Sequence, residues 1–518
     1  PNFYLDGLLN DEDLEENFRY EMPDAIRAEF AKSKEVYFDI KKTYIDSVKN
    51  GETVPFANIV LKGQNVGAST DMDGTFTFPI PLNEGDVLVV SFTGYQTQEY
   101  RLNFNQNIKK NVELGIDAND LEVFEITAEK EDENVRNTEM SVTKIDMKEI
   151  ESIPVLFGER DVMKTIQLLP GVATGGEGSA GFFVRGGSAD QNLIWIDEAP
   201  VYNASHLLGF FSVFNADAIK NVTLTKGGFP ARYGGGLSSV MDVRTREGNS
   251  KEWSGNIKAG LVTSSARIEG PIIKDKASIL ITARRTLLDQ FIQNRTAKSK
   301  ANDQYFQNLY GVPLQGFSNY SFYDLNGKLN FSLGKKDKFY FSYYNGGDKF
   351  SDEDFIKDAI FKDFTYSDKE IQQYNWGNQV GVFRWNHVFG NNLFLNTTLT
   401  HSIFQFDVQE TIEANFIPHA TIPPINIFAG NAYFSRLKDW GAKIDFDYTA
   451  RGNHHFRFGA NSTLHSFQPG AFGANTQVNG NPLFNVNIDS ALNASQIDAY
   501  EHNAYIEDEF LIGKKVDI

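Results

Sequence analysis

From Lys251 onward the chain alternates between short turns and much longer connections as it passes from one β-like segment to the next. We predict four hairpins with short turns, at 255–269 with 277–286, 322–333 with 339–345, 379–389 with 393–406, and 441–449 with 456–467. Between and after these hairpins we predict long loops, near 287–320, 346–376, 407–437 and 468–499. Such alternation is typical of a transmembrane β-barrel, which has short turns on one side of the membrane and long loops on the other.

Residue alternation within these segments supports a barrel wall with one apolar and one polar face. In the segment 456–467 one face carries Phe456, Phe458, Ala460, Ser462 and Leu464, and the other carries Arg457, Gly459, Asn461, Thr463 and His465. We expect the first face to contact lipid and the second to line the lumen. A water-soluble β-sandwich also alternates, but it rarely uses loops of about 30 residues at every second connection.

Four aromatic residues of this region have two interpretations. Tyr366, Tyr374, Trp376 and Trp440 can stack on sugar rings or peptides, as in a surface adhesin or a binding site. They can also form the aromatic girdle at the membrane interface. We favour the girdle.

Composition excludes several classes of function. Among 518 residues, 49 Lys and Arg stand against 68 Asp and Glu, a formal net charge of −19, whereas a nucleic-acid-binding protein needs a basic face. Cysteine is absent, which excludes disulfides and thiol catalysis. The sequence also contains no run of 18 apolar residues, so we predict no transmembrane helix. The His residues are scattered, and His454-His455 lacks the spacing of a helical metal pair. We therefore predict no catalytic residues, no metal site and no cofactor.

The N-terminal part divides into an acidic segment and a small β-domain. Residues 1–36 carry ten acidic and four basic residues, and we assign them no function. Residues 37–115 contain short β-like runs separated by turn residues, which predicts a β-sandwich. Within it, Asp71-Met72-Asp73-Gly74 could open a calcium loop, but an EF-hand needs Glu where Ile80 stands, so we predict a tight turn. The start Pro1-Asn2-Phe3 shows no signal peptide, as in a cytoplasmic protein or a processed or trimmed product.

Residues 116–149 form an acidic linker that contains an apolar-alternating island. Its first part, 116–133, carries eight acidic residues and one Lys. The island consists of Leu121, Glu122, Val123, Phe124, Glu125, Ile126, Thr127 and Ala128. One interpretation is an ordinary connecting strand. The other is a strand kept accessible so that a partner protein can pair with its edge by β-augmentation.

Residues 150–250 are rich in glycine and predict a mixed α/β domain. We expect a helix over 159–169, ended by Pro170-Gly171, and strands at 194–197 and 221–225. Residues 176–181 satisfy G-x-G-x-x-G, but a dinucleotide site needs a helix after the motif, and the β-like Phe182-Phe183-Val184 follows instead. A nucleotide site is therefore not expected.

Two runs resemble known domains. The run GETVPFANIVLKGQNVGASTDMDGTFTFPIPLNEGDVLVVSFTGYQTQEY is similar to the carboxypeptidase-regulatory-like β-sandwich, and no HExxH motif accompanies it. About seventy residues, from GFFVRGGSADQNLIWIDEAP to YGGGLSSVMDVRTREG, resemble the plug of TonB-dependent receptors of the Bacteroidetes type. One departure is that Glu198 follows Asp197, where such plugs usually have Gly, which questions the local turn geometry.

The resemblance marks several plug residues. Arg185, Gly186 and Gly187 match an Arg-Gly-Gly element, and Tyr233 and Gly234 match the turn before the last plug strand. For Arg185 we favour a structural pair with a carboxylate of the barrel wall over a ligand contact. Such a pair would be partly desolvated, and breaking it would cost about 3–5 kcal/mol. For Tyr233 and Gly234 we expect a role in backbone geometry.

The resemblance implies a receptor or transporter of the cell outer membrane. Substrate would bind at the outer face, and a TonB-type inner-membrane coupling protein would capture the N-terminal strand and pull on the plug. Residues 1–149 would then be periplasmic, outer-membrane lipids would surround the wall, and a surface lipoprotein is a further partner to consider. The alternative is a plugged barrel that transports nothing and serves as a structural or docking component. The sequence does not identify a substrate.

The expected fold class is mainly β: a sandwich, a mixed α/β plug, and part of a large antiparallel barrel over 251–518. We count nine strands up to Ile512, and Gly513-Lys514-Lys515 opens a tenth. A barrel of ten strands is filled by its own side chains, whereas housing a plug takes on the order of 22 strands. We therefore expect the sequence to be truncated, with roughly a dozen strands missing.

Overall fold

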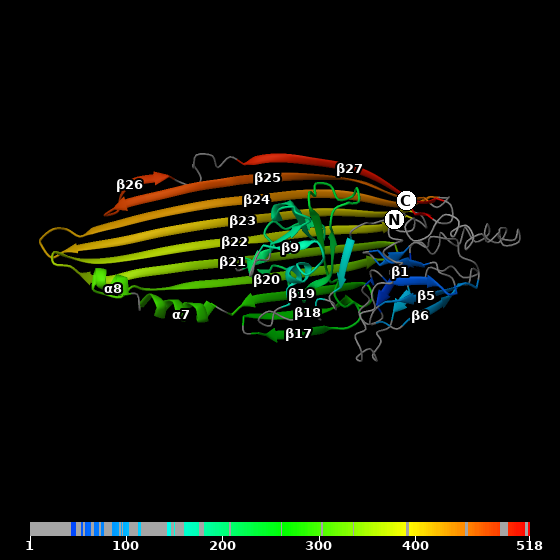
Figure 1. Ribbon diagram of the computed structural model, residues 1–518, viewed down its shortest axis with the longest axis horizontal. Helices are drawn as coiled ribbons and strands as arrows, with labels where there is room; N and C mark the ends of the chain where they lie inside the picture. The colour runs from blue at the N-terminus through cyan, green and yellow to red at the C-terminus, as the bar shows by residue number, and fades with distance from the viewer. Residues whose placement is uncertain are drawn as a thin grey trace.

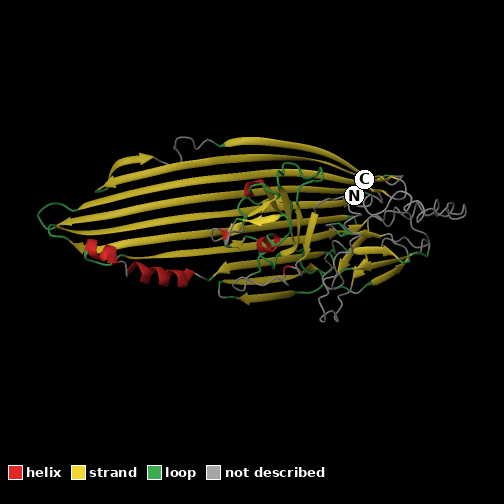
Figure 2. Ribbon diagram, in the orientation of Figure 1, coloured by secondary structure: helices red, strands yellow, loops and turns green. Residues whose placement is uncertain are grey.

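The computed structural model describes residues 160–517 with gaps at 176–180, 207–208, 261, 288, 302–303, 335, 390–392, 451–453, 487–495 and 513–515, and shorter stretches between residues 43 and 150. Strands dominate, and they form a small N-terminal domain, a central domain and one long sheet (Figures 1 and 2). The expected mainly β fold class is confirmed.

The described part of the N-terminal domain contains seven short strands in two sheets. They are β1 (Thr43–Ser47), β2 (Asn58–Leu61), β3 (Gly67–Ser69), β4 (Thr75–Phe76), β5 (Val87–Ser91), β6 (Gln98–Arg101) and β7 (Val112–Leu114). The sheet orders are β3-β2-β5-β6 and β4-β1-β7. Alternate side chains such as Ile59, Leu61, Leu88 and Val90 are buried, as expected when each sheet covers the core with one face. At the predicted tight turn the Gly74 amide donates to the Asp71 carbonyl oxygen at 3.0 Å.

The central domain, which we call the plug, is built on a five-stranded mixed sheet of order β12-β11-β16-β15-β8. Its elements are β8 (Val142–Asp146), α6 (Val162–Ile166), β9 (Val172–Thr174), β10 (Phe182–Val184), the 3-10 helix η1 (Ala189–Gln191), β11 (Asn192–Ile196), β12 (Ala199–Pro200), β13 (Ser205–His206), β14 (Phe211–Ser212), β15 (Ile219–Thr225) and β16 (Ser239–Thr245). The Asp161 side chain caps α6 by accepting the amides of Met163 and Lys164. The expected helix is confirmed but shorter. Gly181 of the G-x-G-x-x-G run leads into strand β10, and the rest of that run lies outside the described residues.

Most of the remaining chain forms one sheet of twelve strands, which we call the wall. The elements of this region are β17 (Ser254–Ala259), β18 (Thr263–Ile273), β19 (Ala277–Thr286), α7 (Asp289–Ala301), α8 (Gln304–Tyr310), β20 (Gln315–Leu333), β21 (Asp337–Ile360), β22 (Phe364–Val388), β23 (Leu393–Pro418), β24 (Ile425–Thr449), β25 (His454–Val478), β26 (Asn481–Val486), β27 (Ile497–Ile512) and β28 (Val516–Asp517). Neighbouring strands are antiparallel throughout, so the expected single sheet is confirmed and two face-packed sheets are not found. Within the described residues, no helix has the length and apolar character needed to span a bilayer.

Two predictions about the wall strands were wrong. The segment 255–269 is not one strand, because the chain turns after Ala259 and forms both β17 and β18. Most of the expected loops at 346–376 and 407–437 are strand, since β21, β22, β23 and β24 continue as paired ladders far past the apolar segments. Both faces of these extensions carry polar and aromatic residues. Without an apolar face, the period-two signal that marks a strand disappears.

The wall has an apolar outer face and a polar inner face. Leu329, Phe341, Phe383 and Leu399 pair across β20, β21, β22 and β23 in one row, and all four are exposed on the outer face. Charged side chains such as Lys328, one position away, are buried on the inner face. This arrangement is the one that a lipid-facing wall requires.

The girdle interpretation stays open for only one of the four aromatic residues. Trp440 is exposed on the outer face, where its ring stacks on His401 at a centroid distance of 3.8 Å. Trp376 is buried on the inner face in a cluster that includes Phe211 of the plug, and Tyr374 packs against the same cluster. Tyr366 stacks on Tyr310 in a separate cluster near the far ends of the strands. Strand parity, which residue type does not reveal, decides these positions.

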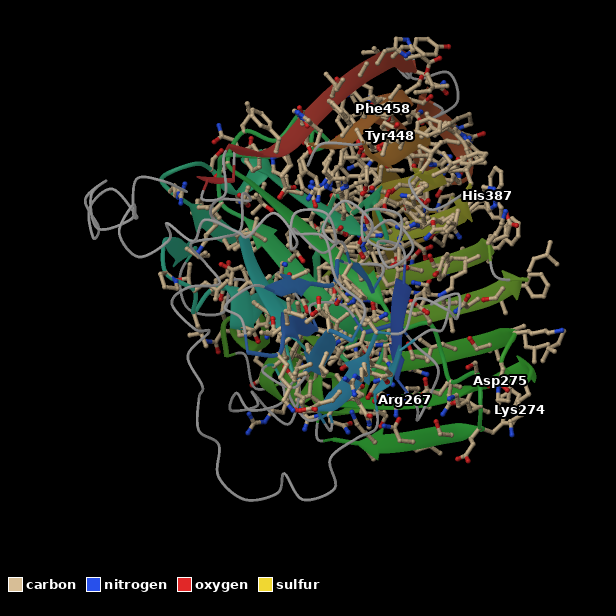
Figure 3. All side chains as sticks on the ribbon, turned by 90° about the vertical axis from the view of Figure 1, so that its right-hand side faces the viewer. Arg267, Lys274, Asp275, His387, Tyr448 and Phe458 are labelled. Atoms are coloured by element: carbon tan, nitrogen blue, oxygen red, sulfur yellow. The ribbon has the colours of Figure 1, made fainter. Side chains whose placement is uncertain are left out.

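The plug lies on the inner, concave face of the wall. Figure 3, which looks along the strands, shows the wall strands curving around the plug strands. The plug core includes Ile196, Phe214 and Met241, and it is continuous with the inner-face residues Tyr344 and Val380 of the wall. Plug and wall therefore share one hydrophobic core.

We expect a charge on the outer apolar row to weaken insertion of the wall according to depth. Leu329→Arg, within the row, should lower the free energy of unfolding by about 2–4 kcal/mol, whereas Leu333→Arg, at the end of β20, should lower it by about 0–1 kcal/mol. The measurement is reversible unfolding in lipid vesicles. Equal losses at the two positions would contradict a lipid-facing row.

Candidate functional site: the interface between plug and wall

The interface between plug and wall is dominated by buried, paired charges. The turn between β11 and β12 places two carboxylates at its tip, because Ile196 pairs with Ala199 and leaves only Asp197 and Glu198 between them. Both residues have positive φ, 48° and 75°. A two-residue hairpin of this kind normally uses Gly at the second position. The turn geometry is thus kept although Gly is absent.

The Glu198 carboxylate is bound by three cations. Oε1 lies 3.0 Å from Nη2 of Arg244 in the plug and 3.8 Å from Nη1 of Arg384 on β22, and Oε2 lies 3.8 Å from Nζ of Lys443 on β24. The Thr398 hydroxyl on β23 donates to Oε2 at 3.1 Å. Burial disfavours the ionised form, but the charges of Lys443, Arg244 and Arg384 outweigh it and hold the pKa of Glu198 well below its ordinary value. Glu198 is therefore an anion that contacts three adjacent wall strands.

Asp197 is bound by a fourth cation. Nζ of Lys328 on β20 lies 3.2 Å from Oδ1 of Asp197 and donates to the Thr245 carbonyl oxygen at 3.0 Å. Burial again opposes ionisation, and Lys328 together with the hydroxyl of Thr245 outweighs it, so the pKa of Asp197 is lowered. We refer to Asp197, Glu198, Arg244, Lys328, Arg384 and Lys443 as the Glu198 cluster.

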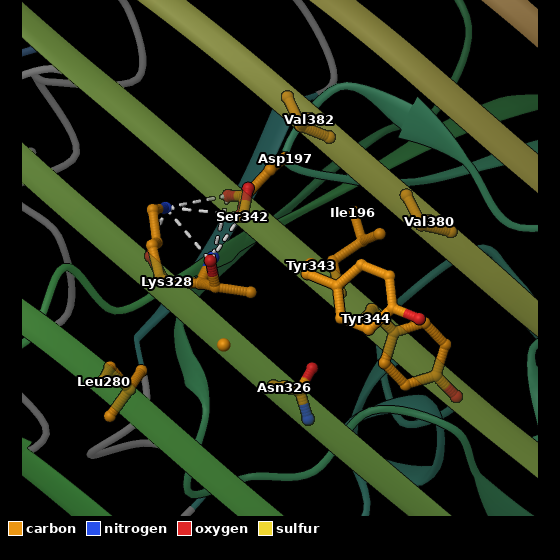
Figure 4. Close-up of a pocket in the computed structure, with 12 residues that line it drawn as sticks. Ile196, Asp197, Leu280, Asn326, Lys328, Ser342, Tyr343, Tyr344, Val380 and Val382 are labelled. Carbon is orange, nitrogen blue, oxygen red and sulfur yellow. Dashed lines mark hydrogen bonds and ion pairs between the residues drawn. The ribbon is translucent and has the colours of Figure 1, made fainter.

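A small cavity lies beside the Glu198 cluster (Figure 4). Its lining includes Asp197, Lys328 and Ser342 on one side and Tyr344 and Val380 on another. Its volume of about 10 Å³ is enough for roughly one water molecule. At this point the plug packs closely against the wall.

A second buried cluster surrounds His206 on β13. Nδ1 of His206 lies 2.7 Å from Oδ2 of Asp348 on β21, and Nε2 lies 2.8 Å from Oδ1 of Asp324 on β20. Arg284 on β19 binds Asp324 at 2.6 Å and donates to the carbonyl oxygen of Ser212 in the plug at 2.7 Å. The imidazole ring stacks on Phe322 at 4.4 Å.

Both ring nitrogens of His206 face carboxylates, so both must donate and the ring is an imidazolium. Burial disfavours this charge, but Asp324 and Asp348 outweigh burial and raise the pKa of His206 to about 9. The other charged and titratable neighbours in the cluster are Arg284, Tyr320 and Tyr344. With His206 protonated, its two carboxylates and two cations balance.

Between these clusters, residues 200–203 of the plug are bound to the wall by polar groups. The Ser402 hydroxyl donates to the Pro200 carbonyl oxygen at 2.7 Å, and the Asn378 amide donates to the Asn203 carbonyl oxygen at 2.6 Å. The Tyr202 hydroxyl donates to Asp439, whose other oxygen is 2.8 Å from Nδ1 of His465. The described plug residues between 197 and 212 are thus attached to strands β19 to β24.

Arg185, Gly186 and Gly187, which the sequence resemblance singled out, form a tight turn. Arg185 and Gly186, with φ of 50° and 82°, form a tight turn in which the Gly187 amide donates to the Val184 carbonyl oxygen at 2.9 Å. A Cβ at Gly187 would lie 2.4 Å from the Ser238 hydroxyl, so this position requires Gly. Arg185 is exposed, and the partly desolvated environment that we expected for it is not found.

The turn at Tyr233 approaches the wall closely. The Tyr233 ring packs on Trp195 at 5.7 Å, and a Cβ at Gly234 would lie 3.3 Å from the Asn503 side chain on β27. The expected role of Tyr233 and Gly234 in backbone geometry stays a prediction. Residues 121–128, the candidate coupling strand, lie outside the described residues, so this role stays a prediction.

Sequence reasoning missed the charged residues of both clusters. The departure at Glu198 was visible, and Lys328 stands on the polar face of a predicted strand, but neither signal identifies a partner. Within the described residues, no group of three or more metal-ligating side chains could hold a metal ion.

At Glu198 we expect ion pairing to outweigh backbone strain. Glu198→Gln keeps the positive φ and removes one of the anions that pair with Arg244, Arg384 and Lys443, which should cost about 3–5 kcal/mol. Glu198→Gly should cost less, because it relieves about 1–2 kcal/mol of strain. Chemical denaturation in detergent measures both losses, with the exposed Asp190→Asn as control. A Glu198→Gly variant as stable as the parent would refute the ion-pair role.

His206 should make stability depend on pH. Its pKa is raised on folding from 6.5 to about 9, so its contribution is complete below pH 6.5 and is lost as the pH rises through 9. The loss should be on the order of 3 kcal/mol, from 1.36 kcal/mol per pKa unit. His206→Gln should remove this dependence of the free energy of unfolding on pH, whereas His401→Gln, on the outer face, should keep it. Denaturation at a series of pH values tests both variants.

Comparison with known protein families assigns the two N-terminal domains. Residues 44–149 match the CarboxypepD_reg-like domain, and residues 134–240 match the TonB-dependent Receptor Plug Domain. Over 213 residues the chain is 28% identical to TonB-dependent receptor SusC of Bacteroides thetaiotaomicron, a match that covers 39% of this chain and 20% of that protein. It is 26% identical over 206 residues to TonB-dependent receptor P26 of Formosa agariphila, covering 38% and 20%.

These matches span only about a fifth of the curated relatives. Among solved structures, the ferric yersiniabactin uptake receptor FyuA from Yersinia pestis is 12% identical with a TM-score of 0.38, over 73% of this chain and 63% of that one.

Proposed function

We propose that this chain, a TonB-dependent receptor of the type that carries a CarboxypepD_reg-like domain ahead of the plug, is part of an outer-membrane receptor or transporter. The observation that carries the proposal is a plug held on the polar inner face of a wall whose outer face is apolar. Residues 1–149 would lie in the periplasm. Substrate would enter from the side of the long strand extensions, and its identity is left open.

The plug contacts suit a gate that opens under force. The space beside the Glu198 cluster takes about one water molecule, so transport requires the ion pairs between plug and wall to separate. A TonB-type coupling protein would supply the force by pairing with the strand at residues 121–128. Pairing through backbone hydrogen bonds suits a mechanical load, because several bonds must break together. No covalent chemistry is needed.

The coupling strand is tested by proline substitution. Phe124→Pro and Ile126→Pro each remove a backbone donor and should abolish capture by the periplasmic domain of the coupling protein, whereas Phe124→Ala and Ile126→Ala should only weaken it. The measurement is a pull-down with the full chain in outer membranes, and Glu131→Pro in the acidic flank is the control. Undiminished capture by both proline variants would place the coupling strand elsewhere.

The second candidate function is a plugged barrel that serves as a docking component and transports nothing. The observation that favours this function is the set of buried ion pairs between plug and wall, because such pairs resist movement of the plug. Loss of capture in the proline variants, with the wall correctly inserted, would favour the transporter.

A further inference from the structure

The sandwich touches the plug through a buried hydroxyl. Thr53, just before β2, is 3% exposed. Its Oγ1 donates to Oε1 of Glu247 at 3.2 Å and accepts from Nζ of Lys220 on β15 at 3.0 Å. A hydroxyl has one proton to donate and lone pairs to accept, so both functions of Thr53 are used by the plug.

Glu247, which follows β16, connects three parts of the molecule. Its carboxylate pairs with Lys220 in the plug at 3.1 Å and accepts from the Asn330 amide of the wall at 3.2 Å. The Ser278 hydroxyl of β19 donates to the Glu247 carbonyl oxygen at 2.8 Å. Thr53 adds the sandwich as the third part.

The chemistry of this junction allows the sandwich to leave without exposing an unpaired charge. Lys220 and Glu247 both belong to the plug, so their ion pair persists when Thr53 departs, and water can replace the hydroxyl. The contacts of the Glu198 cluster differ, because separating them divides cations from anions. The sandwich contact is therefore the easier of the two to open.

We propose that the sandwich is docked on the plug in the resting protein through Thr53, and that it undocks before the plug moves. The chain between β7 and β8 runs from the sandwich to the plug, so a pull on it loads both the Thr53 contact and β8. β8 is held to β15 by a ladder of five residue pairs, from Asp146 with Asn221 to Val142 with Thr225, whereas Thr53 contributes one side chain. The docked sandwich acts as a restraint that opens first. The order of opening rests on the proposed function, and the docking itself does not.

Docking is measured on the full chain by electron paramagnetic resonance. The chain has no cysteine, so Val60→Cys on the sandwich and Lys274→Cys on the turn after β18, both exposed, carry the only two spin labels. The parent should give one narrow distance distribution. Thr53→Val, which removes the hydroxyl but keeps the shape, should shift the distribution to longer and broader distances.

Thr53→Ala is the second variant, which also lacks the hydroxyl and should cause the same shift; it decides the test if Thr53→Val fails to fold. Glu99→Gln is the control, because it breaks the exposed pair with Lys62 and should leave the parent distribution unchanged. A broad distribution in the parent, or an unchanged distribution in folded Thr53→Val, would overturn the proposal. Neither transport nor the coupling protein enters this readout, so its failure is separate from failure of the proposed function.

Discussion

Charges that leave water must be paired, and this constraint determines how the plug sits in the wall. The plug contributes Asp197 and Glu198 to the interface. These carboxylates form ion pairs with Lys328, Arg384 and Lys443 of the wall. Apolar contacts alone would let the plug slide along the wall, since they are not directional. The cations stand on three different strands, so the carboxylates can be satisfied in only one register of plug against wall.

The same constraint explains how a strained turn survives. Glu198 adopts φ of 75°, a region that is costly for any residue with a Cβ. The usual Gly would be relaxed there, but it could not reach Arg244 and the wall. Local backbone strain is thus offset by tertiary ion pairing, and the turn links the plug sheet directly to β22, β23 and β24.

The contacts of the plug with the wall and with the sandwich differ in whether breaking them leaves buried charges unpaired. When the plug separates from the wall, opposite charges in the Glu198 cluster and in the His206 cluster lose their partners. This separation costs free energy until water solvates the charges. Parting Thr53 from Glu247 leaves an intact ion pair within the plug. Breaking the contact at Thr53 therefore costs less than separating the plug from the wall.

The amino-acid sequence by itself determined the architecture: a β-sandwich, a glycine-rich mixed domain and antiparallel strands with alternating faces. These features follow from local signals, namely strand periodicity, turn residues and the Gly requirement at positions such as Gly187. The extent of β21 to β24 was not predicted, because strand segments with polar and aromatic residues on both faces carry no period-two signal. Likewise, the sequence marked Glu198 as unusual but could not show Arg384 or Lys443 beside it. Only the tertiary structure decided those pairs. Glu198 and Arg384 are nearly 200 residues apart in the sequence, and the register and curvature of the wall strands bring them together. Local sequence patterns contain no information about such long-range contacts.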